Sequence, residues 1–201
     1  MLVLLWMKFL SLVVVLEIFD FSSCLKLEAK DDKWVGVARM NDARSEAACA
    51  VFEGKIIVSG GKNNINLNGV NTVEMYDHIT NTWSFMPNMI KRRVDHSSAA
   101  INNKLFVFGS RYGNGKETFE VFDSTCKKFV IIKQKPNSFK LRLNNIAGSF
   151  CIEGKFVLLG NWWSSTALCY DVDKDEWSEE PFEATRNTAG YGCSLVPRMD
   201  I

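Results

Sequence analysis

The 201-residue sequence is poor in proline, with four, and in histidine, with two. It has no Asn-X-Ser/Thr acceptor for N-glycosylation and no Cys-X-X-Cys pair. Without convergent histidines or paired cysteines, a zinc or copper site has no recognisable set of ligands. The net charge is +1, so no basic surface indicates a nucleic acid partner. We therefore expect no metal, no cofactor and no nucleic acid ligand.

Cysteine is present, but in a pattern that favours free thiols. Most of the six cysteines lie in apolar runs, where the side chain behaves as a small buried hydrophobe. Free thiols and the missing glycosylation acceptor predict a cytoplasmic protein. The six are Cys24, Cys49, Cys126, Cys151, Cys169 and Cys193.

The N-terminal segment, residues 1–25, is the one long apolar run. Residues 1–19 contain only two charges, Lys8 and Glu17. A transmembrane helix needs about 20 apolar residues, so the run is marginal as a span. Residues 1–24 could instead act as a signal peptide or anchor, which would make the protein secreted or membrane-bound. The third interpretation is a β-strand.

Self-similarity dominates the rest of the chain. Three segments, 47–61, 97–110 and 148–161, each contain an apolar run, a two-residue turn before Lys and a second apolar run. The turn lysines, Lys55, Lys104 and Lys155, are 49 and 51 residues apart. Such a period is typical of a repeat architecture.

A second landmark keeps the same period. An aromatic residue before Asp is followed seven positions later by another aromatic residue. The pairs are Tyr76 and Trp83, Phe122 and Phe129, and Tyr170 and Trp177. Each unit therefore contains four short strands, with turn signals at Glu53-Gly54, Asn102-Asn103, Thr80-Asn81 and Asp173-Lys174.

Four-stranded units of about 50 residues predict the blades of a β-propeller, in which each sheet hides its faces against its neighbours. The predicted fold is all-β, with about three full blades and part-blades at both ends. Three and a half blades cannot close a ring, since propellers usually have four to eight.

The chain resembles the kelch repeat family. Gly60-Gly61, Tyr76 and Trp83 match the double glycine and the spaced Tyr and Trp of that family. Met40 and Met89, followed by Arg44 and Arg93, match its Met-to-Arg approach to a blade, whereas the third repeat has Asn144 at the aligned place. The remaining repeat positions are Trp34, Gly109, Phe122, Phe129, Gly160, Tyr170 and Trp177.

The flanks extend this resemblance. Trp34 lies 49 residues before Trp83, so we expect it in the last strand of an earlier blade, with residues 17–20 in that blade's third strand. The expected divisions are a blade end at 26–40, repeats at 41–90, 91–136 and 137–182, and a closing strand at 183–197. We expect a fragment of a longer protein, or a half-propeller that closes by self-association through its open edges.

The expected binding residues lie on loops of one propeller face, because loops on a rigid scaffold carry recognition. Exposed Trp, Tyr and Arg are typical binding hot spots. For Arg44 and Arg93 the alternative is a structural role, bonding loop carbonyls between blades. His78 and His96 are interpreted as turn or surface residues. The candidates are Arg44, Asn63, Asn66, Arg93, Arg111, Tyr112, Arg142, Trp162, Trp163 and Arg186.

The resemblance implies a non-catalytic protein-binding module. The preferred function is the substrate-recognition propeller of a cullin-type ubiquitin ligase adaptor, which would contact the cullin only through a BTB part missing from this chain. The alternatives are an actin- or cytoskeleton-binding kelch protein and a secreted or membrane-tethered propeller. The expected partner is accordingly a protein substrate or a cytoskeletal protein.

Overall fold

The structure is a computed structural model that describes residues 3–7, 11–15, 22–28, 31–111, 118–132, 146–152, 154–160 and 166–181. In this part of the chain sixteen strands form four antiparallel four-stranded sheets, and no helix is present. Each sheet uses four strands that are consecutive in the sequence. The predicted all-β fold with four-stranded blades is confirmed.

The sheets follow one another along the chain. The first comprises β1 (Val3–Met7), β2 (Ser11–Val15), β3 (Cys24–Glu28) and β4 (Lys33–Val37). The second comprises β5 (Ala48–Phe52), β6 (Lys55–Ser59), β7 (Val73–Asp77) and β8 (Thr82–Met86). The third comprises β9 (Ser97–Ile101), β10 (Lys104–Phe108), β11 (Phe119–Asp123) and β12 (Lys128–Ile131). The fourth comprises β13 (Ile146–Ile152), β14 (Lys155–Gly160), β15 (Thr166–Asp171) and β16 (Glu176–Pro181).

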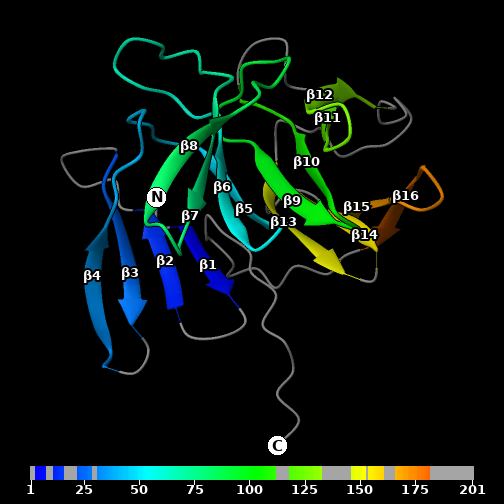
Figure 1. The fold of residues 1–201 in the computed structure, drawn as a ribbon. Helices are drawn as coiled ribbons and strands as arrows, with labels where there is room; N and C mark the ends of the chain where they lie inside the picture. Colours follow the sequence, from blue (N-terminus) through cyan, green and yellow to red (C-terminus); the bar gives the residue numbers. More distant parts are fainter. Residues whose placement is uncertain are drawn as a thin grey trace, which may run out of the picture.

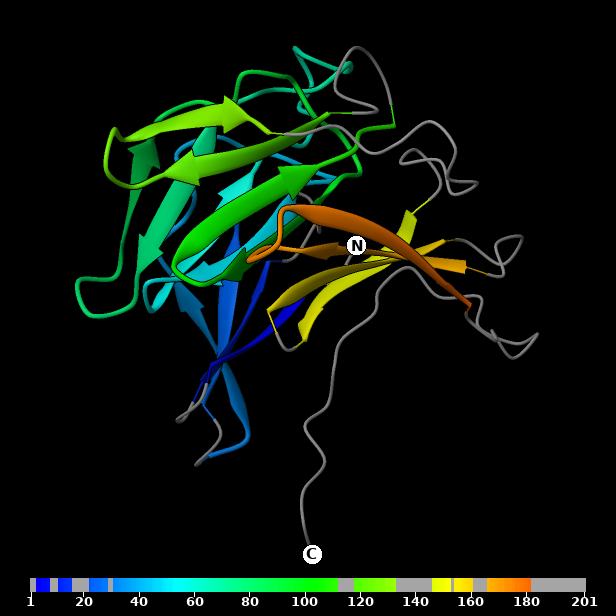
Figure 2. The ribbon, with the colours of Figure 1, turned by 90° about the vertical axis from the view of Figure 1, so that its right-hand side faces the viewer.

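The first strand of each sheet lies beside the first strand of the next, so the sheets fan out from a common axis (Figure 1). The turned view shows the fourth sheet, yellow to orange, beside the green third sheet (Figure 2). This radial arrangement is that of propeller blades.

Tight hairpins join the first two strands of a blade. Glu53 and Gly54 have φ of 50° and 72°, and Asn102 and Asn103 have φ of 47° and 57°. Two consecutive positive φ values define the type I′ turn, whose twist matches that of the flanking strands. The turns predicted at these four residues are therefore confirmed.

The aspartate after each blade aromatic begins the turn between the third and fourth strands. Asp77 Oδ1 accepts the backbone N–H of Ile79 at 2.9 Å, and Asp123 Oδ1 accepts that of Thr125 at 2.8 Å. The N–H group of Asp173 donates to Asp171 Oδ1 in the same way. These side-chain turns fix the hairpin length, and they explain the constant spacing of seven between the paired aromatics.

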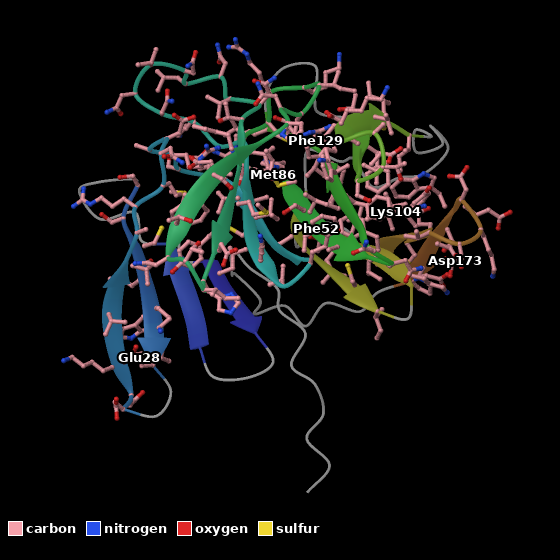
Figure 3. The ribbon with its side chains drawn as sticks, viewed as in Figure 1. Glu28, Phe52, Met86, Lys104, Phe129 and Asp173 are labelled. Carbon is pink, nitrogen blue, oxygen red and sulfur yellow. The ribbon has the colours of Figure 1, made fainter. Side chains whose placement is uncertain are left out.

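Hydrophobic clusters fill the three interfaces between sheets. Tyr76 and Trp83 of the second sheet pack with Cys24 of the first. Phe52 of the second sheet packs with Phe122 and Phe129 of the third, and Figure 3 shows Phe52 and Phe129 on neighbouring sheets. The interface between the third and fourth sheets is rich in aromatic residues, namely Phe106, Phe108, Phe119, Phe156 and Tyr170. The flat faces are thus hidden blade against blade.

The N-terminal part of the chain adds a sheet. Residues 1–25 and 26–40 were expected to supply a strand remnant and a blade end, but their described strands complete a fourth blade. Its third strand is β3, and the expected strand at 17–20 lies outside the described residues. The spacing of seven locates β3: Leu27 pairs with Trp34 as Tyr76 pairs with Trp83. Leu27 was overlooked because it is not aromatic.

Trp34 marks the face of the first sheet that has no preceding blade in the described structure. Trp83 and Phe129, at the same place in the next two sheets, are only 9% and 4% exposed because they pack toward the sheet before. Trp34 is 43% exposed. The expected closing strand at 183–197 lies outside the described residues.

Among the described residues, no helix is long and apolar enough to cross a membrane.

Candidate binding face

Loops of successive blades are bonded together at one end of the propeller. They are the loop between β6 and β7 (60–72), the described ends of the loop between β10 and β11 (109–111 and 118), and the lead-in loops that precede β5 (38–47) and β9 (87–96). Short bridges join Ser45 to Lys62 and Val70 to Arg93. The Asp95 N–H donates to Glu46 O at 2.9 Å, across the second and third blades. We call this end of the propeller the loop face.

Arg44 lies beneath the loop face rather than on it. The residue is 2% exposed. Its Nη1 donates to Gly60 O at 2.8 Å, and its Nη2 donates to Glu74 Oε1 at 2.8 Å. Glu74, itself fully buried, also accepts the backbone N–H of Asn41 at 2.7 Å. Arg44 therefore ties a lead-in loop to the middle of its own blade.

Arg93 repeats this arrangement one blade later. It is fully buried, and its Nη1 donates to Gly109 O at 2.7 Å. Its Nη2 donates to Glu120 Oε1 at 2.7 Å, and Glu120 Oε2 accepts the backbone N–H of Ile90 at 2.6 Å. Burial lowers the pKa of Arg93, and the nearby Glu120 carboxylate offsets that shift.

The interpretation of Arg44 and Arg93 as surface binding residues is therefore wrong. A side chain with almost no exposed area cannot contact a ligand, and both are committed to carbonyl oxygens and a glutamate. The structural alternative also needs one change, because these contacts lie within a blade and not between blades. Sequence reasoning missed Glu74 and Glu120, although each stands two residues before the blade aromatic.

The third repeat supports this pairing. It has Leu168 two residues before Tyr170, where Glu74 and Glu120 stand in the other repeats, and Asn144 where they have arginine. Arginine and glutamate are thus missing together. Leu168 is fully buried, and a lone carboxylate at such a place would be an uncompensated buried charge.

The double glycine fits the close approach of two blades. Gly60 and Gly61 have φ of 59° and 88°. A Cβ on Gly60 would lie 2.7 Å from Arg93 O and 2.7 Å from His96 Cε1, and one on Gly61 would lie 2.6 Å from Ser45 O. In the next repeat Ser110 follows Gly109, and its Oγ accepts the Val94 N–H at 3.1 Å. The kelch glycines here are contact points.

Arg111 does lie on the loop face, with 42% of its side chain exposed. Its guanidinium pairs with Asp95 of the lead-in loop and lies 3.8 Å from Glu46. Glu46 also pairs with Lys62 at 2.6 Å. These charges form a network across two blades, which we call the charge network (Glu46, Lys62, Asp95 and Arg111).

Three hydrogen bonds shape the loop between β6 and β7. Asn63 Oδ1 accepts the backbone N–H groups of Ile65 at 3.1 Å and Asn66 at 2.7 Å. The Gly69 N–H donates to Asn66 O at 3.1 Å. Asn63 and the Asn66 backbone thus shape the loop. The prediction that the side chains of Asn63 and Asn66 contact a ligand stays untested.

Two aliphatic side chains project from this loop. Ile65 is 88% exposed and Leu67 is 65% exposed. They were not among the sequence candidates, although they alternate with asparagine in a stretch, residues 63–71, that contains no charge. The candidates Tyr112, Arg142, Trp162, Trp163 and Arg186 lie outside the described residues.

His96 is half-buried, whereas the sequence suggested a turn or surface residue. Its Nε2 lies 2.9 Å from Ser59 Oγ, which sets a serine beside a histidine. Ser59 is only 1% exposed, and within the described residues His96 Nδ1 has no hydrogen-bond partner to orient the ring. A nucleophilic serine needs both access and an oriented base, so this pair is structural.

The described residues also contain no group of three or more His, Cys, Asp or Glu side chains that could hold a metal ion.

Comparisons with known proteins agree with the repeat. The family description "Kelch motif" matches residues 43–90. The chain is 26% identical to Kelch-like protein 36 of Bos taurus over 89% of this chain and 31% of that protein. It is 30% identical to an F-box/kelch-repeat protein of Arabidopsis thaliana over 58% of this chain and 30% of that one. The chain thus spans about a third of the length of these relatives.

A solved structure shares the fold. YjhT superposes with a TM-score of 0.70 at 18% identity, over 87% of this chain and 64% of that one. At this identity the likeness concerns the fold. The repeat landmarks, the radial four-stranded sheets and these matches together show that the chain belongs to the kelch repeat family.

Proposed function

We propose that this chain binds another protein through its loop face and contributes no catalysis of its own. The observation that carries the proposal is the held loop between β6 and β7, which presents Ile65 and Leu67 to solvent. A loop already fixed in one conformation loses little entropy on binding. The charge network beside it offers partly exposed polar groups for the rim of an interface.

Crosslinking tests this proposal with a matched control. A photo-crosslinking amino acid replaces Ile65 in one variant and Ile79 in another. Ile79 is 82% exposed but lies in the turn after β7, at the opposite end of that strand. The expected result is a specific protein adduct from position 65 and none from position 79.

The captured protein is then purified and its affinity measured directly. We expect the double variant Ile65→Ser/Leu67→Ser to weaken binding at least tenfold, while Ile79→Ser leaves the affinity unchanged. Equal crosslinking at the two positions, or equal affinities for the two variants, would place the interface elsewhere and contradict the proposal.

We further propose that the bound protein is a substrate of a cullin-type ubiquitin ligase. The support is the similarity to kelch-like and F-box/kelch-repeat proteins. A protein with this chain fused behind a BTB domain should bring down both the cullin and the bound protein, whereas this chain alone should bring down only the latter. Cullin recovered with this chain alone would contradict the division of roles.

A cytoplasmic location completes the proposal. The described cysteines are free thiols, and burial raises the pKa of Cys24, Cys49 and Cys151 to about 12. A reducing compartment keeps such thiols free. Alkylation of the protein from cells, without prior reduction, should label every cysteine once the chain is unfolded. Cysteines labelled only after reduction would favour the secreted alternative.

A further inference from the structure

The His96 ring fills a junction between the second and third blades, which we call the seam. Its Nε2 lies 2.9 Å from Ser59 Oγ on β6, although His96 itself leads into β9. Its Cε1 lies 2.7 Å from the position that a Cβ on Gly60 would take. The half-buried ring therefore packs against the neighbouring blade.

The hydrogen bonds leave one ring nitrogen without a partner. Ser59 Oγ lies 2.9 Å from His96 Nε2 and 3.5 Å from Ala48 O, and the hydroxyl can donate to Nε2 or accept from it. In the charged ring both nitrogens carry a proton, so Nδ1–H would then need an acceptor. Nδ1 is buried and, within the described residues, has no partner.

The charges around the seam disfavour a second proton. The two cations that act on the ring are Arg93 and Arg44, which belong to the lead-in loops of the two blades. Desolvation first, and then the charges of Arg93 and Arg44, hold the pKa of His96 well below its ordinary value of 6.5. The nearby carboxylates are already engaged by cations: Glu74 by Arg44, Glu120 by Arg93, Asp95 by Arg111, and Glu46 by Lys62.

Backbone bonds cross the seam beside the ring. The Gly61 N–H donates to Arg93 O at 2.9 Å, and the Asp95 N–H donates to Glu46 O at 2.9 Å. The charged ring would need water at the buried Nδ1, and separation of these contacts would admit it.

We propose that His96 is a proton-sensitive latch: uptake of one proton by its imidazole opens the loop-face end of the seam while the sheets on either side stay folded. The closed seam holds a neutral imidazole, and the open seam exposes an ordinary one. The closed form is therefore fully favoured above about pH 6.5 and loses its advantage as the pH falls. One proton makes the open fraction rise up to about tenfold per pH unit below 6.5.

Hydrogen exchange of single amides tests the latch between pH 7.5 and 5.0. The seam amides are Gly61 and Asp95, and the reference amide is Gly109, which bonds within its own blade to Thr118 O. The ratio of seam to reference protection cancels the pH dependence of chemical exchange. We expect the seam amides to lose protection relative to the reference by up to about tenfold per pH unit.

Two variants locate the cause. His96→Gln keeps a side-chain N–H for Ser59 but cannot titrate, so its protection ratio should stay constant with pH. His78→Gln is the control, because His78 is the other histidine of the chain and lies exposed in the turn after β7. His78→Gln should behave as the wild type.

Several results would overturn the latch. One is a protection ratio that does not change with pH in the wild type. Another is a ratio that falls with pH in His96→Gln as much as in the wild type. The third is a fall with pH that is lost in His78→Gln. If His96→Gln does not fold, nitrogen NMR of the wild-type imidazole decides. The latch requires a neutral imidazole at pH 7 and no titration of the closed form near 6.5. An imidazole that titrates at 6.5 while the seam amides stay protected contradicts it.

Discussion

Arg93 Nη2 donates to Glu120 Oε1 at 2.7 Å, and both side chains are fully buried. The pair connects a lead-in loop to the third strand of its blade, as Arg44 and Glu74 do one blade earlier. The blade therefore holds its own lead-in loop in place by a charge pair. The loop face is built on lead-in loops that are fixed in this way.

Removing one member of this pair should lower the stability of the fold much more than replacing both members. We expect Arg93→Asn to destabilise the chain by about 3–5 kcal/mol, because Glu120 would keep a buried charge without a partner. The double variant Arg93→Asn/Glu120→Leu copies the third repeat and should recover most of that loss. Urea unfolding of both single variants and the double variant completes the cycle. Additive losses would show that the two side chains are not coupled.

A methyl group at Gly60 should disturb the seam. Gly60→Ala would put Cβ 2.7 Å from Arg93 O at a positive φ, whereas Gly36 has no atom within 4 Å of its Cβ position. We expect a loss of about 1–3 kcal/mol for Gly60→Ala and a change within about 0.5 kcal/mol for Gly36→Ala. Thermal unfolding measures both. A tolerated Gly60→Ala would mean that the blades approach less closely.

The two aligned tryptophans should differ in their contributions to stability. Trp83 is buried, and its Nε1 donates to Ala38 O at 2.8 Å, whereas Trp34 is 43% exposed. We expect Trp83→Ala to cost about 3–5 kcal/mol and Trp34→Ala clearly less, because less apolar area leaves water. Equal losses in urea unfolding would show that something covers the Trp34 face in solution.

Thiol reactivity should follow burial. Cys126 is exposed at a turn, whereas burial raises the pKa of Cys24 and Cys49 to about 12. A raised pKa leaves fewer thiolates at neutral pH, and the thiolate is the reactive form. The hydrogen bond with Asp123 also raises the pKa of Cys126, so we expect Cys126 to react slowly with iodoacetamide at pH 7.4, and Cys24 and Cys49 more slowly still. Peptide mapping over time resolves the order, and an early adduct on Cys24 would contradict the closed interface.

Local chemistry made the blades predictable. Positive φ at Glu53-Gly54 and Asn102-Asn103, the aspartate turns and the spaced aromatics act over a few residues, so a sequence pattern reports them. The repeat period of 49 placed Trp34 in the fourth strand of its blade. The third strand of that blade was expected at 17–20 but is β3, where Leu27 fills the aromatic place.

The candidate site was predictable only in its location. Of the loops that the repeat pattern selected, those of the second blade and the described part of those of the third meet at one end of the propeller, and those of the fourth blade lie outside the described residues. Which of their side chains face solvent was not predictable. The charged Arg44 is buried and the aliphatic Ile65 is exposed, the reverse of what their chemistry suggests. A charged side chain can be buried where a carboxylate meets it, and an aliphatic one can be exposed where the backbone turns outward.

The sequence by itself determined the repeat, the four-strand unit and the turn chemistry, since these depend on contacts between neighbours in the chain. Only the tertiary structure decided that Arg93 finds Glu120 and that His96 finds Ser59. Those contacts join residues 27 and 37 positions apart, and their energies depend on the water that packing of the blades removes.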